Sequence, residues 1–170
     1  MLDHLKAWLG PDWGELAGGT CHAEIPLTAS LINRFIADRL ARGKGRISAA
    51  VVEVHDADRL TVHLRPRAAL LPPMQVNLQV VAQPEFPASP VLVLRWSLAG
   101  GLGVMARMAS PVLSLFDVMP PGVRIDGDLV GIDVAELLRA RGFERALPFV
   151  RQLQVKTVET TVRITVALAR

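Results

Sequence analysis

Hydrophobic and polar residues alternate along two neighbouring segments of the chain, residues 49–55 and 60–65. The apolar positions are Ala50, Val52 and Val54 in the first segment and Leu60, Val62 and Leu64 in the second. A period of two is typical of a β-strand with one buried face. With a turn at residues 56–58, each apolar residue of one strand lies opposite an apolar residue of the other, beginning with Val54 opposite Leu60. The pattern therefore predicts a β-hairpin in this register, because a slip by one residue would break the agreement.

The same alternation returns in two later segments, residues 74–82 and 92–98. Their apolar positions are Met74, Val76, Leu78 and Val80, followed by Leu92, Leu94, Trp96 and Leu98. A proline-rich loop separates the two segments and predicts a turn between strands. We expect four strands that form one wall of a sheet, with their apolar residues on a common face.

A helix is predicted before these strands. Residues 22–27 look extended, and Thr28 is a suitable N-cap for a helix that ends near Gly43. At helical spacing its apolar face consists of Leu31, Ile32, Phe35, Ile36 and Leu40. This face is expected to pack on the sheet.

The C-terminal part of the chain alternates between short strands and a helix. Residues 123–132 predict two short strands, and Asp133 caps a helix that stops at Gly142. Residues 149–168 predict a final hairpin, whose turn is either Val158-Glu159 or a looser loop. This order of elements predicts an α+β fold with a largely antiparallel sheet.

One domain is expected for residues 21–170, because a chain of 170 residues can bury a proper core without metals or disulfides. Residues 1–20 are expected to form an N-terminal amphipathic segment. Leu2, Leu5 and Trp8 share a helical face there, which could dock on the domain or touch a membrane.

The longest apolar stretch spans residues 96–116 and carries one charge, Arg107. A transmembrane helix is disfavoured, because a charge near its middle costs about 2.5–3.5 kcal/mol and Pro111 weakens the helix further. Two interpretations stay open. The segment is either a core helix under the sheet or a helix that lines a lipid-sized cavity.

The composition favours an aliphatic interior. Apolar residues make up 51% of the chain, aromatic residues only 5%, and tyrosine is absent. An interior of this kind suits alkyl chains better than flat rings. The single cysteine, Cys21, excludes an internal disulfide.

Basic residues are densest at the end of the first predicted helix, and the net charge of +3 alone decides little. Cations there complement the helix dipole, so a structural role stays open. The functional interpretation is contact with anionic lipid head groups at a membrane surface. Nucleic-acid binding is disfavoured, because no aromatic residues for base stacking lie among the cations. The residues predicted to contact head groups are Arg39, Arg42, Lys44 and Arg46.

Catalytic, metal and cofactor chemistry is not indicated. His55 and His63 are expected on one polar face about four residues apart, roughly 13 Å at the rise of a strand. That distance is too long for one metal ion, whose ligands lie at about 2.0–2.2 Å. The chain contains neither a Gly-x-Ser-x-Gly motif nor a glycine-rich loop followed by Lys-Ser or Lys-Thr. We expect a protein that is not an enzyme and that holds no metal or cofactor.

The N-terminus lacks the organisation of a secretory signal, because Asp3, His4 and Lys6 interrupt its apolar residues. Export by that route is therefore not expected. The expected location is the cytoplasm or the periphery of a bacterial inner membrane.

A helix that begins after Ile25-Pro26-Leu27-Thr28, with Leu31-Ile32-Asn33 in its first turns, is followed by a run of long one-sided strands. Over roughly residues 23–98, this order resembles the bacterial relatives of the tubular lipid-binding superfamily. The resemblance implies a curved antiparallel sheet that wraps around one or two apolar helices. It also implies a lipid in the apolar channel between sheet and helix.

We expect a binding module that holds a lipid or fatty-acid-like ligand in an apolar cavity, with Met74, Met105, Met108 and Met119 as adaptable wall residues. The alternative is a structural or interaction domain with a filled core, which self-associates as a homodimer or docks a partner through an apolar patch. The residues predicted to line the cavity are Leu31, Phe35, Val52, Val62, Leu78, Leu94, Trp96, Leu102, Met105, Met108, Val112 and Phe116.

Overall fold

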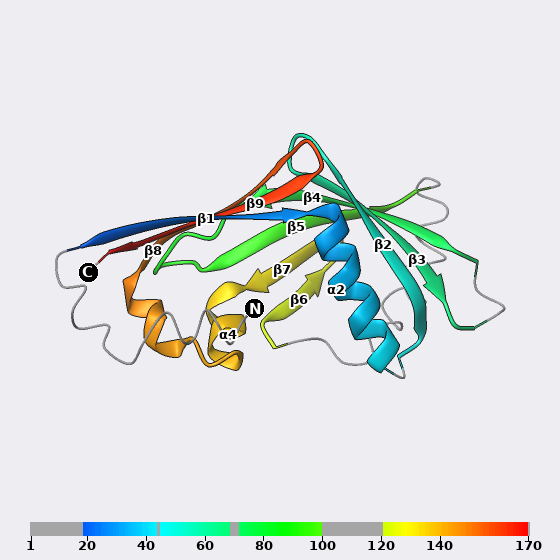
Figure 1. The fold of residues 1–170 in the computed structure, drawn as a ribbon, viewed down its shortest axis with the longest axis horizontal. Helices are drawn as coiled ribbons and strands as arrows, with labels where there is room; N and C mark the ends of the chain where they lie inside the picture. The colour runs from blue at the N-terminus through cyan, green and yellow to red at the C-terminus, as the bar shows by residue number, and fades with distance from the viewer. Residues whose placement is uncertain (1–18, 44, 69–71, 100–120, 170) are drawn as a thin grey trace.

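The computed structural model describes residues 19–43, 45–68, 72–99 and 121–169, and it shows an α+β fold (Figure 1). The N-terminal segment 1–18 and most of the apolar stretch 96–116 lie outside the described residues. The elements are β1 (Thr20–Thr28), α2 (Ala29–Arg42), β2 (Ile47–His55), β3 (Arg59–Pro66), β4 (Met74–Ala82), β5 (Val91–Leu98), β6 (Val123–Asp126), β7 (Leu129–Asp133), α4 (Val134–Ala140), a 3-10 helix η2 (Glu144–Phe149), β8 (Val150–Val158) and β9 (Thr161–Ala169).

The described strands form two sheets in which every pair of neighbours is antiparallel. One sheet has the order β1-β9-β8, and the other has the order β2-β3-β4-β5-β7-β6. The predicted α+β class with antiparallel strands is confirmed. Where the alternation pattern suggested one sheet, the hydrogen bonds divide the strands into two.

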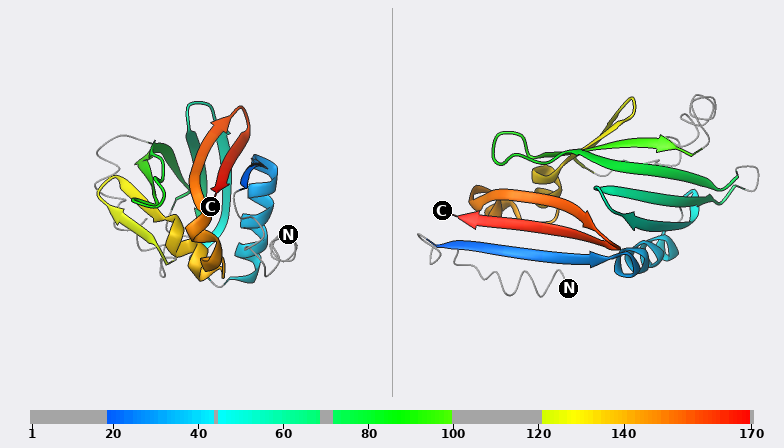
Figure 2. Two further views of the ribbon diagram at one scale, coloured as in Figure 1. Left: turned by 90° about the vertical axis from the view of Figure 1, so that its left-hand side faces the viewer. Right: turned by 90° about the horizontal axis from the view of Figure 1, so that it is seen from above.

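Strands of both sheets form an arched layer, and the helices lie on one side of it (Figures 1 and 2). In the left view of Figure 2, α2 descends on one side of the arch and the β6–β7 hairpin descends on the other. The arch therefore has a convex outer face and a concave inner face toward which α2 and α4 extend.

The hairpin of β2 and β3 has the register that the alternation pattern predicts. Val54 pairs with Leu60 and Ala50 pairs with Leu64 across a turn at residues 56–58. Ala57 and Asp58 adopt positive φ angles of 60° and 58°, which close this short turn. The predicted four-stranded wall is also confirmed, because β2, β3, β4 and β5 are consecutive in the sheet.

The last hairpin differs from the prediction. The turn is formed by Glu159 and Thr160, so that Val158 pairs with Thr161 and Val155 lies opposite Ile164. The predicted turn at Val158-Glu159 is wrong. Glu159 adopts a positive φ of 54°, a conformation that is uncommon for glutamate and that the sequence therefore does not predict.

Helix α2 begins at the predicted cap, where the amide of Leu31 donates to Thr28 Oγ1 at 3.3 Å. Asn33 determines which face of α2 packs on β2. Its Nδ2 donates to the carbonyl of Val52 at 2.9 Å, and its Oδ1 accepts from the amide of Val52 at 2.6 Å. Phe35, about 200° further around the helix, points away from β2 and is 55% exposed, so the prediction that Phe35 packs on the sheet is wrong.

Side chains also close the outer edge of β8, in the place of a neighbouring strand. Gln83 bonds both backbone groups of Val155, at 2.7 and 2.9 Å. Two carboxylates of the β2–β3 turn accept from amides further along the same edge. Asp58 accepts from the amide of Thr157 and Asp56 accepts from the amide of Glu159, each at 2.8 Å. These bonds join the two sheets, and we call them the seam.

Helix α4 starts at the predicted cap, Asp133, whose Oδ1 accepts from the amide of Glu136 at 2.9 Å. It ends before Gly142, which has a positive φ of 79°. Within the described ranges, the structure contains no helix of the length and apolar character that crossing a membrane requires.

Candidate functional site

The predicted apolar wall lies on the concave side of the six-stranded sheet, on strands β2 to β5. Every second residue of these strands faces it. Leu64, Met74, Val76, Trp96 and Leu98 form one buried cluster, and Val130 of β7 packs against it. The buried residues of the wall are Val52, Val54, Leu64, Met74, Val76, Leu92, Trp96 and Leu98.

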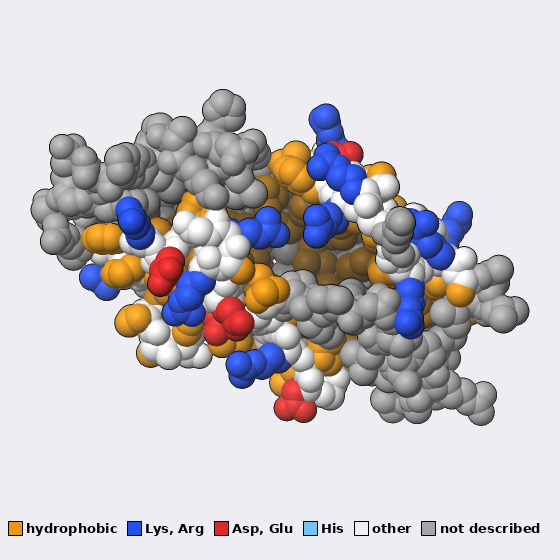
Figure 3. All heavy atoms as spheres, turned by 90° about the horizontal axis from the view of Figure 1, so that it is seen from below, with side chains coloured by type: hydrophobic (Ala, Val, Ile, Leu, Met, Phe, Trp, Pro, Cys, Tyr) orange, Lys and Arg blue, Asp and Glu red, His pale blue; other side chains and the backbone are white. Residues whose placement is uncertain are grey.

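The residues that the structure describes cover this wall only partly. Val62 and Leu78 contact the buried cluster but remain half-buried. Of the side chains that the structure describes, none is less than 2% exposed, although interiors of compact domains are close-packed. Figure 3 shows a hollow lined by hydrophobic side chains, with Lys and Arg on its rim.

The structure describes seven of the residues predicted to line a cavity. Val52 and Trp96 are buried, Phe35 is exposed, and the half-buried members are Leu31, Val62, Leu78 and Leu94. Val62, Leu78 and Trp96 are brought together at the cluster. The remaining predictions lie outside the described residues: Leu102, Met105, Met108, Val112 and Phe116.

The residues predicted to line a cavity did not include three members of the buried cluster, Leu64, Val76 and Leu98. Each was recognised as an apolar strand position but not as part of the cavity wall. The signal was available in the register, because Val76 lies opposite both Val62 and Leu98.

The predicted head-group residues gather at the end of the arch where α2 meets β2. Arg39, Arg42 and Arg46 are exposed, and Lys44 lies outside the described residues. Because Ile47 pairs with Pro66, the end of β3 reaches the same place and brings two more arginines.

These additional arginines, Arg65 and Arg67, are 20 or more residues away from Arg39 and Arg42 in the sequence. The amide of Arg67 donates to the carbonyl of Arg46 at 2.7 Å, and its Nη2 donates to the carbonyl of Gly43 at 3.2 Å. Residues 39–47 and 64–68 contain no Asp or Glu. We call this group, Arg39, Arg42, Arg46, Arg65 and Arg67, the basic end.

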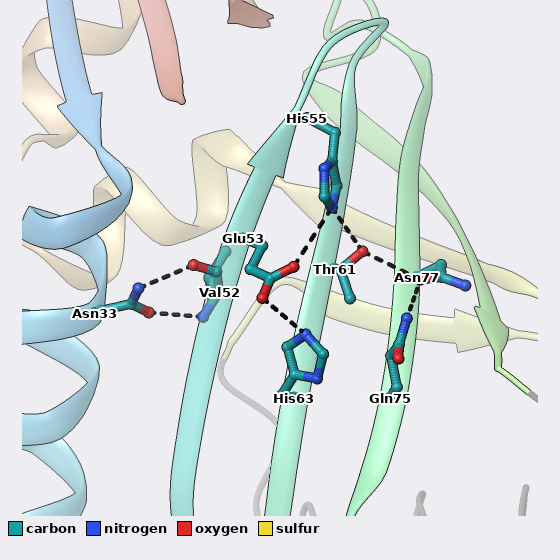
Figure 4. A network of polar contacts seen from close by, with 8 residues as sticks. All are labelled: Asn33, Val52, Glu53, His55, Thr61, His63, Gln75 and Asn77. Atoms are coloured by element: carbon teal, nitrogen blue, oxygen red, sulfur yellow. Dashed lines mark hydrogen bonds and ion pairs between the residues drawn. The ribbon is translucent and has the colours of Figure 1, made fainter. Parts of the chain in front are cut away.

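The convex face of the same sheet carries polar residues (Figure 4). His55 pairs with Arg59 and His63 with Val51, as predicted. The predicted separation of the two imidazoles is wrong, because both lean toward Glu53 between them. Their Nε2 atoms lie 4.0 and 3.3 Å from its carboxylate oxygens.

A hydrogen-bond chain runs across this face from His55 to Asn77. The Thr61 hydroxyl lies 2.9 Å from His55 Nε2 and donates to Asn77 Oδ1 at 3.2 Å. The Thr61 oxygen is therefore left to accept from His55 Nε2–H. Over the described ranges, no group of three His, Cys, Asp or Glu residues is arranged to hold a metal ion.

Comparison of the chain with family models, with curated proteins and with solved structures found no match. The arguments about function therefore rest on the residues and their geometry.

Proposed function

We propose that the protein binds a lipid or fatty-acid-like molecule in the hollow between the arched sheet and the helices, without catalysis. The observation that carries this proposal is the partly covered apolar wall. It combines a buried cluster with half-buried Val62 and Leu78, and no described side chain is less than 2% exposed. The resemblance of the sequence to the tubular lipid-binding superfamily points in the same direction.

Aliphatic side chains suit an alkyl chain, because burial of apolar surface is non-directional and contributes about 0.8 kcal/mol for each CH₂ group. Val62, Leu64, Val76, Leu78 and Leu98 supply such a surface along neighbouring strands. Met74 adds a flexible thioether that adapts to irregular ligands. A bound alkyl chain would complete the burial of the wall.

The experiment that tests the proposal is solvent extraction of the purified protein, followed by mass analysis. We expect co-purified lipid, or stoichiometric uptake of a fluorescent fatty acid by the emptied protein. Protein that yields no lipid and takes up neither fatty acid nor phospholipid contradicts the proposal. A tight dimer without ligand would instead support the alternative, a self-associating domain with a filled core.

A matched pair of variants locates the ligand on the wall. Ala50 is half-buried against the cluster, whereas its neighbour Ala49 is exposed on the opposite face. Ala50→Phe places a ring in the hollow and displaces two or three methylene groups of the ligand. This weakens binding of the fluorescent fatty acid by about 2 kcal/mol, or roughly thirtyfold.

Ala49→Phe is the control, because it adds the same ring on the other face of the same strand. Its affinity for the fatty acid should equal that of the unchanged protein. Equal affinities of the two variants would show that the ligand does not lie on the apolar wall.

The basic end is proposed to contact anionic head groups when the module meets a membrane. Each arginine near an anionic surface contributes about 1 kcal/mol. Replacing Arg39, Arg42 and Arg65 together by Gln should therefore weaken binding to phosphatidylglycerol-containing vesicles by about 3 kcal/mol, roughly a hundredfold. Co-sedimentation at low salt measures this loss.

The control replaces three exposed arginines elsewhere, Arg124, Arg139 and Arg151, by Gln. It lowers the net charge by the same amount, and its binding to the vesicles should fall much less. Equal losses in the two triple variants would mean that overall charge, and not the basic end, governs the contact.

A further inference from the structure

A second cleft lies on the convex face of the six-stranded sheet, which the apolar hollow does not use. Its volume is about 460 Å³, within the range of small-molecule sites. No Asp or Glu belongs to the residues that line it, which are His55, Arg59, Leu60, Thr61, Asn77, Leu78, Gln79, Arg95 and Ser97.

The cleft is built on two rows of residues that cross the sheet. His55, Arg59, Gln79 and Arg95 are consecutive partners on β2, β3, β4 and β5. Neighbouring strands lie about 4.8 Å apart, so the two arginines lie on either side of Gln79, roughly two strand spacings apart. Thr61, Asn77 and Ser97 form the adjacent row.

Hydrogen bonds on this face leave donors in excess. Asn77 Oδ1 accepts from Thr61 Oγ1 at 3.2 Å and from Gln75 Nε2 at 3.4 Å (Figure 4). The oxygen of this amide is thus occupied, which leaves its NH₂ group to donate. Arg59 uses Nε for the carbonyl of Asp56 at 3.2 Å, and the terminal nitrogens of its guanidinium group carry further N–H donors.

Arg95 forms a weak, solvent-exposed ion pair. Its Nε lies 3.2 Å from Asp128 Oδ2, and both side chains are more than half exposed. An exposed ion pair of this kind contributes little to stability. The guanidinium can therefore turn toward a ligand without a large loss.

The lining supplies two guanidinium groups and amide donors, while the neighbouring carboxylates of Glu53 and Asp128 lie against His55 and Arg95. Such a set of donors recognises an acceptor-rich anion. Arginine binds planar or tetrahedral oxyanions through paired N–H donors. We propose that this cleft is a binding site for a small anionic molecule that carries a phosphate or carboxylate group. The polar residues of this site lie on the opposite face of the sheet from the apolar hollow, so either site can fail without the other.

The test is a two-dimensional NMR titration of the full chain with inorganic phosphate, glycerol 3-phosphate and citrate in separate arms. We expect saturable shift changes at the amides of Arg59, Gln79 and Arg95 in at least one arm. Saturation by the phosphates alone assigns a phosphate group, and saturation by citrate alone assigns a carboxylate. Linear, non-saturating changes in all arms overturn the proposal.

Three variants distinguish binding at the cleft from a general effect of the protein's net charge. Arg59→Gln and Arg95→Gln should each weaken binding about tenfold or more, because each removes a charge-assisted contact. Arg163→Gln is the control, since Arg163 also forms an exposed ion pair, with Glu24 at 2.9 Å, but on the other sheet. Equal losses in all three variants overturn the proposal.

Asn77→Asp provides a test that does not depend on arginine. It replaces the donating NH₂ group by a carboxylate oxygen, while Thr61 can still donate to the other oxygen. Folding should persist, as judged by unchanged shifts at the apolar wall, and anion binding should be lost. Retained binding would show that the cleft does not hold the anion.

Discussion

Replacing Trp96 with alanine is expected to lower the free energy of unfolding by about 3–5 kcal/mol, the usual range for a buried Trp. Trp96 is 6% exposed and lies in the buried cluster with Leu64, Met74, Val76 and Leu98. Its indole Nε1 also donates to the carbonyl of Gly127 at 3.0 Å. Urea unfolding followed by circular dichroism measures the change, because fluorescence would itself be altered.

Trp96→Phe separates packing from the hydrogen bond. It keeps an aromatic ring in the cluster but leaves the Gly127 carbonyl without its donor, so a loss of about 1–2 kcal/mol is expected. Similar losses for both variants would show that the hydrogen bond, and not the packed ring, dominates. A loss below 1 kcal/mol for Trp96→Ala would contradict the assignment of Trp96 to the core.

The second large effect is expected at Asn33, where one side chain bonds both backbone groups of Val52 on the edge of the sheet. Val52 is 8% exposed, so water replaces these bonds poorly. Asn33→Leu leaves the amide and the carbonyl of Val52 unsatisfied and should cost about 2–4 kcal/mol. Urea unfolding measures this loss as well.

Arg34→Leu is the control for that variant, because Arg34 is an exposed neighbour on the same helix and has a helix propensity close to that of Leu. It should change stability by less than about 0.5 kcal/mol. If the two variants were equally stable, α2 would not be held to β2 through Asn33.

The β2–β3 hairpin was predictable because the residues that determine it are close together in the sequence. Val52 and Val62 belong to strictly alternating strands, and the turn at 56–58 joins them directly. The β8–β9 hairpin was harder, since apolar residues such as Val150, Leu153 and Val155 do not follow one clear alternation. Its turn also uses Glu159, which carries no turn signal.

The way in which the two sheets are joined could not be predicted, because long-range contacts make the seam. Gln83 meets Val155 across 72 positions of sequence, and Asp58 meets Thr157 across 99. No local pattern marks Gln83 as a residue that bonds a strand edge. Asn33 did leave a signal, as a polar residue between apolar ones in the first turns of a helix.

The two candidate sites differ in how far the sequence led to them. The apolar wall followed from alternation in single strands, so its described members were all recognised as apolar strand positions, although Leu64, Val76 and Leu98 were not assigned to a cavity. The convex cleft needs the registers of four strands at once, since Arg59, Gln79 and Arg95 are far apart in the chain. Read one strand at a time, such residues look like an ordinary solvent-exposed face.

The seam also affects how molecules of this protein meet one another. An open strand edge offers its amides and carbonyls to any passing extended peptide and so promotes aggregation. Gln83 already bonds the amide and the carbonyl of Val155, and Asp58 and Asp56 already bond the amides of Thr157 and Glu159. That stretch of β8 is therefore a poor template for a foreign strand, and the residues that join the sheets also disfavour edge-to-edge contact between neighbouring copies there.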